Sequence, residues 1–152
     1  MKKIIAIDPG INGGIAWIDD DIVQAIPMPE GMTSQADLLK EIVTLMYPLT
    51  RPIIGIIEKT GTYKPGNSGI AAVTFARHCG NLEAILYMLP DVSTSQVSPQ
   101  IWQKLLGSLP KEKLDRKREI KEKMARLYPH LTVTLKTSDA LGILTWASRL
   151  SY

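Results

Sequence analysis

The sequence is poor in cysteine and has no long hydrophobic run. Its 152 residues include one cysteine, Cys79, which excludes an internal disulfide framework and a cysteine-based zinc site and fits a reducing compartment. We expect Cys79 to be a small buried apolar residue. No segment approaches the roughly 18 consecutive apolar residues of a membrane span, and the N-terminus lacks the long apolar region of a signal peptide. The sequence therefore predicts a cytoplasmic protein with no membrane partner.

A strong excess of one charge is also missing. Lys and Arg number 18 against 15 Asp and Glu, so the formal net charge is only +3. This small excess permits binding to nucleic acid without requiring it. The length predicts one domain, residues 1–152, which is long enough to bury a substantial core.

The chain opens with a strand that ends in an acid. Ile4 to Ile7 form a short apolar run, Asp8 follows it, and Pro9-Gly10 stops the strand. A glycine-rich turn then leads to a second apolar strand, Ile15 to Ile18, which predicts a hairpin. A carboxylate beside an open turn suits a metal ion or a phosphate. An aspartate before Pro-Gly is also a common turn residue that bonds its own backbone.

A second apolar strand repeats this design. Ile53 to Ile57 form the strand, and Glu58 stands at its C-terminal end. Two parallel buried strands that each finish in a carboxylate place Asp8 and Glu58 side by side at one edge of a sheet. Like charges repel there unless a cation lies between them. The alternative for Glu58 is a salt bridge to Lys59 or another base.

A third acid, Asp139, falls in the first turn of a predicted final helix that Thr137 or Ser138 caps. The helix dipole alone favours an acid at that position. Together with Asp8 and Glu58 it forms a set of hard oxygen ligands, which suit Mg²⁺ or Mn²⁺ better than zinc. Two such ions can drive an in-line attack of water on a phosphodiester. The set therefore favours a metal-dependent nuclease.

The segment from Lys111 to Arg126 is the most basic part of the chain. It holds eight bases and four acids, a net charge of +4, and Ile120, Met124 and Leu127 give it one apolar stripe on a helix. Such a face is commonly mere solvated surface, but the imbalance of sign favours phosphate contact. With a polar loop before the next helix, it supplies the predicted DNA-binding residues, which are Lys64, Asn67, Lys111, Lys113, Arg116, Lys117, Arg118 and Lys121.

The remaining pattern alternates strands and helices. A helix is expected from Ser34 to Met46, and a long one from Gly69 to Met88 has Gly80 as a position of close packing and His78 as a surface or satisfied residue. The other expected elements are a third strand at Ile22 to Ile26, a polar edge strand at Val92 to Val97, and a helix at Gln100 to Leu106 after Ser98 and Pro99.

Several of these pieces, in this order, resemble the RuvC-type Holliday junction resolvases of the RNase H-like superfamily, in their compact phage and bacterial form. The likeness rests on Ile5 to Gly10 with Gly13-Gly14, Ile56 to Glu58, the Gly69 to Ile85 helix with Gly80, Val97 to Pro99 with Trp102 and Leu106-Gly107, the basic segment Lys113 to Lys123, and Ser138 to Leu141.

The resemblance implies an α/β fold with a five-stranded mixed sheet, the first three strands antiparallel, flanked by helices. It implies that Asp8, Glu58 and Asp139 are catalytic and bind Mg²⁺ or Mn²⁺. It further implies a homodimer that cleaves four-way or other branched DNA in recombination and repair, in a bacterial or phage-infected host cell. A two-fold dimer suits a two-fold substrate.

One position departs from the resolvase pattern. Members of the family usually have an acid or a histidine about three residues before the final aspartate, where this chain has Lys136. Lys136 either supplies positive charge to the scissile phosphate, as a catalytic residue, or marks a weakened metal site. A shifted helix start, or a ligand from elsewhere such as His130, is a further alternative.

Two other functions compete with the nuclease. Actin-like phosphotransferases also open with a strand, an aspartate and a glycine turn, but they need two such lobes and this chain has length for one. A junction-binding protein that has weakened or lost cleavage is the second alternative, and Lys136 supports it.

Overall fold

A five-stranded sheet runs through the molecule in the order β3-β2-β1-β4-β5. The computed structural model describes residues 2–61 and 68–150. The strands are β1 (Lys3–Asp8), β2 (Gly14–Asp19), β3 (Ile22–Pro27), β4 (Ile53–Glu58) and β5 (Val92–Val97). The first three strands pair antiparallel, whereas β4 runs parallel to β1 and β5 parallel to β4. The predicted mixed sheet and its polar edge strand are thus confirmed.

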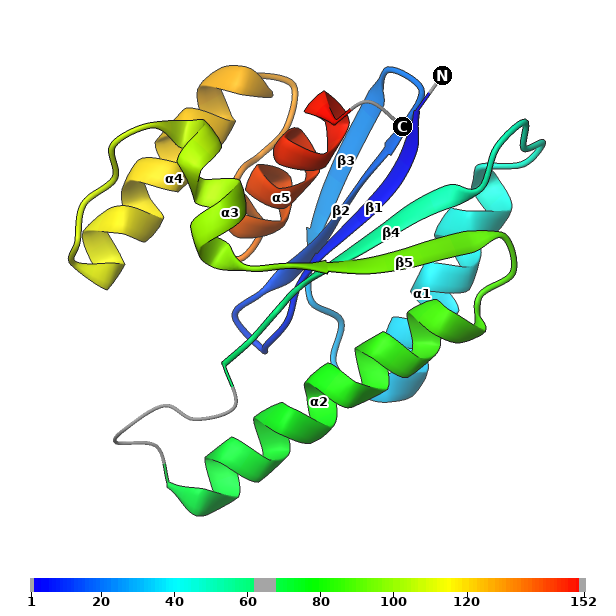
Figure 1. The fold of residues 1–152 in the computed structure, drawn as a ribbon, viewed down its shortest axis with the longest axis horizontal. Helices are drawn as coiled ribbons and strands as arrows, with labels where there is room; N and C mark the ends of the chain where they lie inside the picture. The colour runs from blue at the N-terminus through cyan, green and yellow to red at the C-terminus, as the bar shows by residue number, and fades with distance from the viewer. Residues whose placement is uncertain (1, 62–67, 151–152) are drawn as a thin grey trace.

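Helices cover both faces of this sheet (Figure 1). One face carries α1 (Met32–Leu45) and α2 (Gly69–Met88), and the other carries α3 (Pro99–Gln103), α4 (Lys113–Leu127) and α5 (Ser138–Arg149), with a short 3-10 helix η1 (Lys104–Leu106) after α3. Within the described residues, no helix is both long and apolar enough to cross a membrane.

The central strand β1 is apolar throughout because both of its faces are buried. Ile5 and Ile7 pack in the core beneath α1 and α2, whereas Ile4 and Ala6 pack in the core beneath α3, α4 and α5. Side chains alternate between the faces of a strand, so residues of one parity share one core. The same alternation sets the direction of the acid that ends the strand.

Some local details differ from the sequence expectations. α1 begins at Met32 after Gly31, two residues earlier than expected, because the chain enters the helix from a glycine with a positive φ of 81°. Ser98 and Thr137 stand at N-cap positions as expected, but neither side chain makes a capping hydrogen bond. The segment after Pro99 divides into α3 and η1 instead of forming one helix.

Two packing expectations were wrong. A Cβ atom on Gly80 would have no neighbour within 4 Å, so nothing in the described part of the chain packs closely there. Leu127 is 47% exposed, because the apolar stripe of α4 buries only Ile120 and Met124 before the helix ends. Cys79 is buried, as expected.

Candidate active site

The register of the two central strands brings Asp8 and Glu58 to the same edge and the same face of the sheet. Ile7 pairs with Ile57 in the parallel ladder, so Asp8 and Glu58 are the next residues on adjacent strands. Both acids follow the even-numbered positions of β1 and β4 whose side chains pack towards α3, α4 and α5. The predicted parallel pairing is confirmed, and alternation directs both carboxylates to that side.

Asp139 reaches the same place from a different element. It lies in the first turn of α5, and α5 packs across β1 and β2. Only 8% of Asp139 is exposed, and Asp8 is similarly buried at 7%. Burying an ionised carboxylate costs free energy unless polar or cationic neighbours compensate for the lost hydration. The contacts of each acid therefore determine what the site can do.

All three acids line one cavity of about 560 Å³. The β1–β2 turn and Phe75 of α2 also line it, and α4 contributes three bases: Lys113, Arg116 and Lys117. The cavity is thus lined by three acids and three bases. That combination suits a phosphodiester, whose charge the bases would meet while the acids hold cations.

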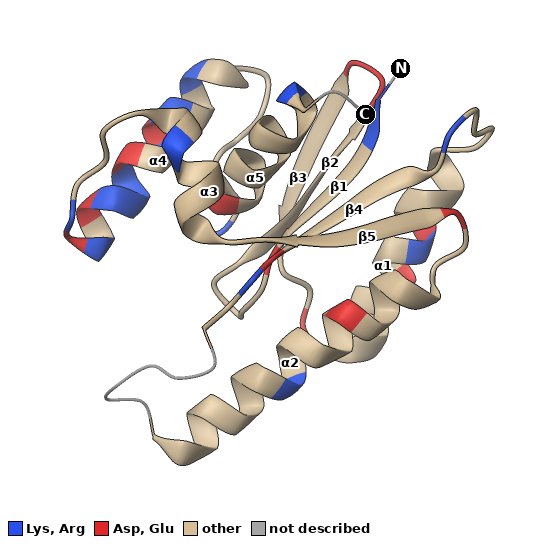
Figure 2. Cartoon of the chain, in the orientation of Figure 1, with Lys and Arg blue, Asp and Glu red and all other residues tan. Residues whose placement is uncertain are grey.

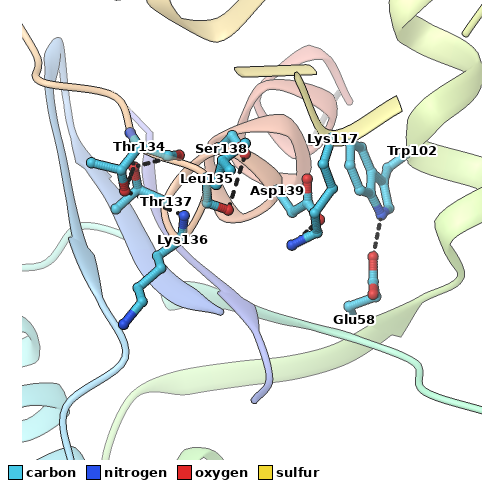
Figure 3. Close-up of polar contacts among 9 residues, drawn as sticks. All are labelled: Glu58, Trp102, Lys117, Thr134, Leu135, Lys136, Thr137, Ser138 and Asp139. Carbon is cyan, nitrogen blue, oxygen red and sulfur yellow. Dashed lines mark hydrogen bonds and ion pairs between the residues drawn. The ribbon is translucent and has the colours of Figure 1, made fainter. Parts of the chain in front are cut away.

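Two of the acids make defined contacts with side chains (Figure 3). The Nε1–H of Trp102, from α3, donates to Oε2 of Glu58 at 2.7 Å. The Nζ atom of Lys117, from α4, lies 3.3 Å from Oδ2 of Asp139. The other carboxylate oxygen of Asp139, Oδ1, is buried and has no hydrogen-bond partner among the described residues.

The environment of Asp139 perturbs its ionisation. Burial raises the pKa of the Asp139 carboxyl, and the nearby positive charges of Lys117, Arg116 and Lys113 lower it by a smaller amount. Asp139 is therefore a carboxylate whose charged form is under-stabilised by this chain alone. A divalent cation beside Oδ1 would supply the missing stabilisation.

The donor set fits a hard divalent cation. Three carboxylates from β1, β4 and α5 face one cavity, and one of them has an unpartnered buried oxygen. Within residues 2–61 and 68–150, however, no three acidic, histidine or cysteine side chains are gathered tightly enough to form a ready metal site. Trp102 contacts Oε2 of Glu58 and Lys117 contacts Oδ2 of Asp139, so the buried Oδ1 of Asp139 is the oxygen that would meet an ion.

Lys136 and His130 are not part of this cavity. Lys136 is exposed in the turn before α5, and its side chain points away from Asp139 and Lys117 (Figure 3). His130 contacts the carbonyl of Val23 through Nε2 at 3.3 Å, on the β3 side of the sheet. The positive charge beside the last acid comes from Lys117.

The predicted DNA-binding residues divide into three groups. Lys113, Arg116 and Lys117 line the cavity, whereas Lys111, Arg118 and Lys121 are not among its lining residues. Arg118 forms an ion pair with Asp115 at 3.5 Å, and Arg116 donates to the carbonyl of Lys111 at 2.8 Å. Lys64 and Asn67 lie outside the described residues.

Sequence reasoning missed the neutral side chains that surround the acids. Trp102 was noted only as part of a resemblance, yet a fully buried indole needs an acceptor for its N–H, and Glu58 is that acceptor. His78 was expected to be a surface or satisfied residue; it is bonded, and its partner, the Gly10 amide, belongs to the turn that lines the cavity. A partner for Trp102 could be anticipated from the rule that buried indole N–H groups are hydrogen-bonded. The partner of His78 depends on the tertiary arrangement and could not be anticipated.

The strand order, the antiparallel β1–β2–β3 unit and the flanking helices define an RNase H-like fold, with acids at the carboxyl end of β1 and β4. Within that class, the fold is similar to that of two solved RuvC structures. T. thermophilus RuvC in complex with a Holliday junction substrate has a TM-score of 0.61 and 15% identity, covering 98% of this chain and 96% of that chain. A second Thermus thermophilus RuvC structure has a TM-score of 0.56 and 17% identity, covering 97% and 95%. No protein-family model and no curated protein matches the sequence.

Proposed function

We propose that this protein is a divalent-metal-dependent endonuclease that cleaves four-way or other branched DNA. The observation that carries the proposal is the shared cavity: carboxylates from three separate elements face three bases of α4. The RuvC-type fold supports the choice of branched DNA, since one of the similar RuvC structures holds a Holliday junction substrate.

Asp8, Glu58 and Asp139 would hold the ions, Mg²⁺ or Mn²⁺. When bound, such ions activate water and stabilise the leaving oxygen of a phosphodiester. The chain's own contribution is to orient the carboxylates. Trp102 donates to one oxygen of Glu58, and the positive charge of Lys117 favours the ionised form of Asp139 against the effect of burial. The Lys117 ammonium also lines the cavity, where it would be able to meet a phosphate oxygen.

The DNA backbone would run along α4. Figure 2 shows that this helix carries much of the charge of the chain, and Lys113, Arg116 and Lys117 lie on its cavity side. Lys111, Arg118 and Lys121 would extend the contact outward, and Lys64 and Asn67 would add contacts from the loop before α2. Contacts of this kind position the duplex and are sensitive to salt.

A second copy of the chain would pack on α2. This helix has only two charged residues, Arg77 and Glu83, and is nearly free of charge colour in Figure 2. Its exposed side carries Ile70 and Val73, which are 82% and 66% exposed, near the end of the helix that extends beyond the sheet (Figure 1). The open surface at Gly80 would let a partner helix approach closely. A homodimer formed this way would match the two-fold symmetry of a four-way junction.

The direct test is cleavage of a synthetic four-way junction with Mg²⁺ or Mn²⁺, compared with linear duplex of the same sequence. We expect paired nicks on opposite strands of the junction and little cutting of the duplex. ATP turnover without nicking would instead support a phosphotransferase.

The second candidate is a junction-binding protein with weakened or lost cleavage. The observation that favours it is the absence of a ready metal cluster among the described residues, together with Lys136 in place of a fourth ligand. Tight binding to the junction with no nicking at any concentration of Mg²⁺ or Mn²⁺ would support this candidate.

A further inference from the structure

A histidine from α2 contacts the turn that follows Asp8. The backbone N–H of Gly10 donates to Nε2 of His78 at 2.9 Å. Phe75 lies about one helical turn before His78 on α2, and its Cε2 atom would be 3.4 Å from a Cβ placed on Gly10. Two side chains of one helix therefore lie at the same glycine, and His78 is bonded to its amide.

The turn depends on such an outside contact. Gly10 has a φ of +119°, a conformation open to glycine and strained for other residues. Within the turn, the N–H of Gly13 donates to the carbonyl of Gly10 at 2.9 Å, and a Cβ on Gly13 would lie 2.0 Å from the carbonyl oxygen of Asp8. A glycine-rich turn has many alternative conformations, so a fixed arrangement next to Asp8 requires contacts that select one of them.

His78 can accept this bond only as a neutral imidazole with its proton on Nδ1. Burial lowers the pKa of the His78 imidazole, which favours that neutral form near pH 7. The ring is half-buried on α2 and its acceptor nitrogen faces the backbone of the turn.

We propose that His78 is a positioning residue of the acidic cavity, which acts by holding the Gly10 amide and so keeps the Asp8 carboxylate in the arrangement that binds the metal ion. The inference rests on the proposed function for the role of the cavity. It adds a link between α2 and the site, because the helix that would meet a second copy of the chain also fixes the turn after β1.

The test compares two substitutions at His78. His78→Gln retains a side-chain acceptor that can reach the amide, whereas His78→Phe retains a ring and loses the acceptor. The same two changes at His130, the only other histidine and one remote from the cavity, are the matched controls. Thermal melts by circular dichroism identify any variant that fails to fold.

The first measurement concerns the bond itself and needs neither metal nor DNA. Amide hydrogen exchange on the ¹⁵N-labelled full chain should show Gly10 protected in the wild type and in His78→Gln, and exchanging about tenfold faster or more in His78→Phe. Imidazole ¹⁵N shifts should place the His78 proton on Nδ1. An unprotected Gly10 amide in the wild type would overturn the proposal.

The second measurement concerns the site. Calorimetric titration with Mn²⁺ should show about tenfold weaker binding for His78→Phe, the range typical when a contact behind a metal ligand is lost. We expect His78→Gln and both His130 variants to stay close to the wild type. Junction cleavage should follow the same order in kcat, with KM for the junction little changed.

The outcomes distinguish a failure of the proposed nuclease function from a failure of the positioning role of His78. Wild-type protein that binds no Mn²⁺ and nicks no junction overturns the proposed function and, with it, the role of His78 in that cavity. Wild-type protein that binds Mn²⁺ and nicks the junction, with His78→Phe equal to it in both, overturns the positioning role alone. Equal loss in His78→Gln and His78→Phe also overturns it, because an acceptor would then not be what matters.

Discussion

Gly142 on α5 is the position where the smallest change should disturb the site most. A Cβ atom at this glycine would lie 2.5 Å from Cζ3 and 3.0 Å from Cε3 of Trp102, which is fully buried. Trp102 in turn donates its indole N–H to Glu58. The substitution Gly142→Ala adds one methyl group to a helix and should displace the indole, and with it the carboxylate.

Two opposing effects set the sign of the change in stability. Alanine is favoured over glycine in a helix interior by about 1 kcal/mol. Overpacking of a core costs about 1–3 kcal/mol, and loss of a hydrogen bond to a charged group costs about 1.5–3 kcal/mol. The unfavourable effects are larger because the Cβ contact of 2.5 Å is with a rigid, enclosed ring. We expect Gly142→Ala to reduce the free energy of unfolding by about 1.5–5 kcal/mol.

Urea unfolding of the wild type, Gly142→Ala, Trp102→Phe and the double variant measures this directly. A phenylalanine ring does not reach as far as the indole benzo ring, so the cost of the added methyl should be smaller in the Trp102→Phe background, giving a coupling energy of about 1 kcal/mol or more. Junction cleavage by Gly142→Ala should fall although every acid is retained. A Gly142→Ala protein that is more stable than the wild type and fully active would refute this account of the Trp102–Glu58 contact.

Four further outcomes follow from the same cavity. Asp8→Asn should abolish cleavage, by roughly a thousandfold or more, and leave junction binding in a gel-shift assay intact; full activity would remove Asp8 from the mechanism. Lys117→Ala should lower cleavage well below that of Lys136→Ala in parallel rate measurements, and the reverse order would restore Lys136 as the catalytic lysine. Burial raises the pKa of Asp139 in the folded state, so ionisation of this carboxyl destabilises the fold as pH rises above the ordinary aspartate value. Asp139→Asn should therefore unfold at a higher urea concentration than the wild type at pH 7. This difference should shrink as the pH is lowered towards about pH 4. Val73→Lys should convert the proposed homodimer to a monomer in light scattering, and a variant that remains dimeric would contradict the proposed interface on α2.

The sequence was sufficient to predict the framework of the site. Apolar runs that end in Asp8 and Glu58 predicted two parallel buried strands, and alternation within a strand determines the face on which each final residue lies. The start of the last helix was predicted to within one residue, which placed Asp139 in its first turn. These features depend on local patterns with fixed periods.

The contacts of the acids could not be predicted in the same way. From the sequence alone, either Lys117 or Lys136 could contact Asp139. Lys117 would reach it from another helix, whereas Lys136 is close to it along the chain. The choice between them depends on how α4 packs against α5, which brings Lys117 to the carboxylate, while Lys136 precedes the helix and points away. The amide partner of His78 likewise comes from 68 residues away. Local periodicity carries no information about such pairs.

The acids of this cavity are positioned by groups that bear no negative charge. An indole holds Glu58, an ammonium holds Asp139, and an imidazole holds the turn after Asp8. Each partner supplies a donor, a positive charge or an acceptor where burial would otherwise leave a polar group unsatisfied. The Lys117 contact is to Oδ2 of Asp139, so an ion would meet this carboxylate at the buried Oδ1. Metal affinity in this protein should therefore depend on the residues behind the acids as strongly as on the spacing of the acids themselves.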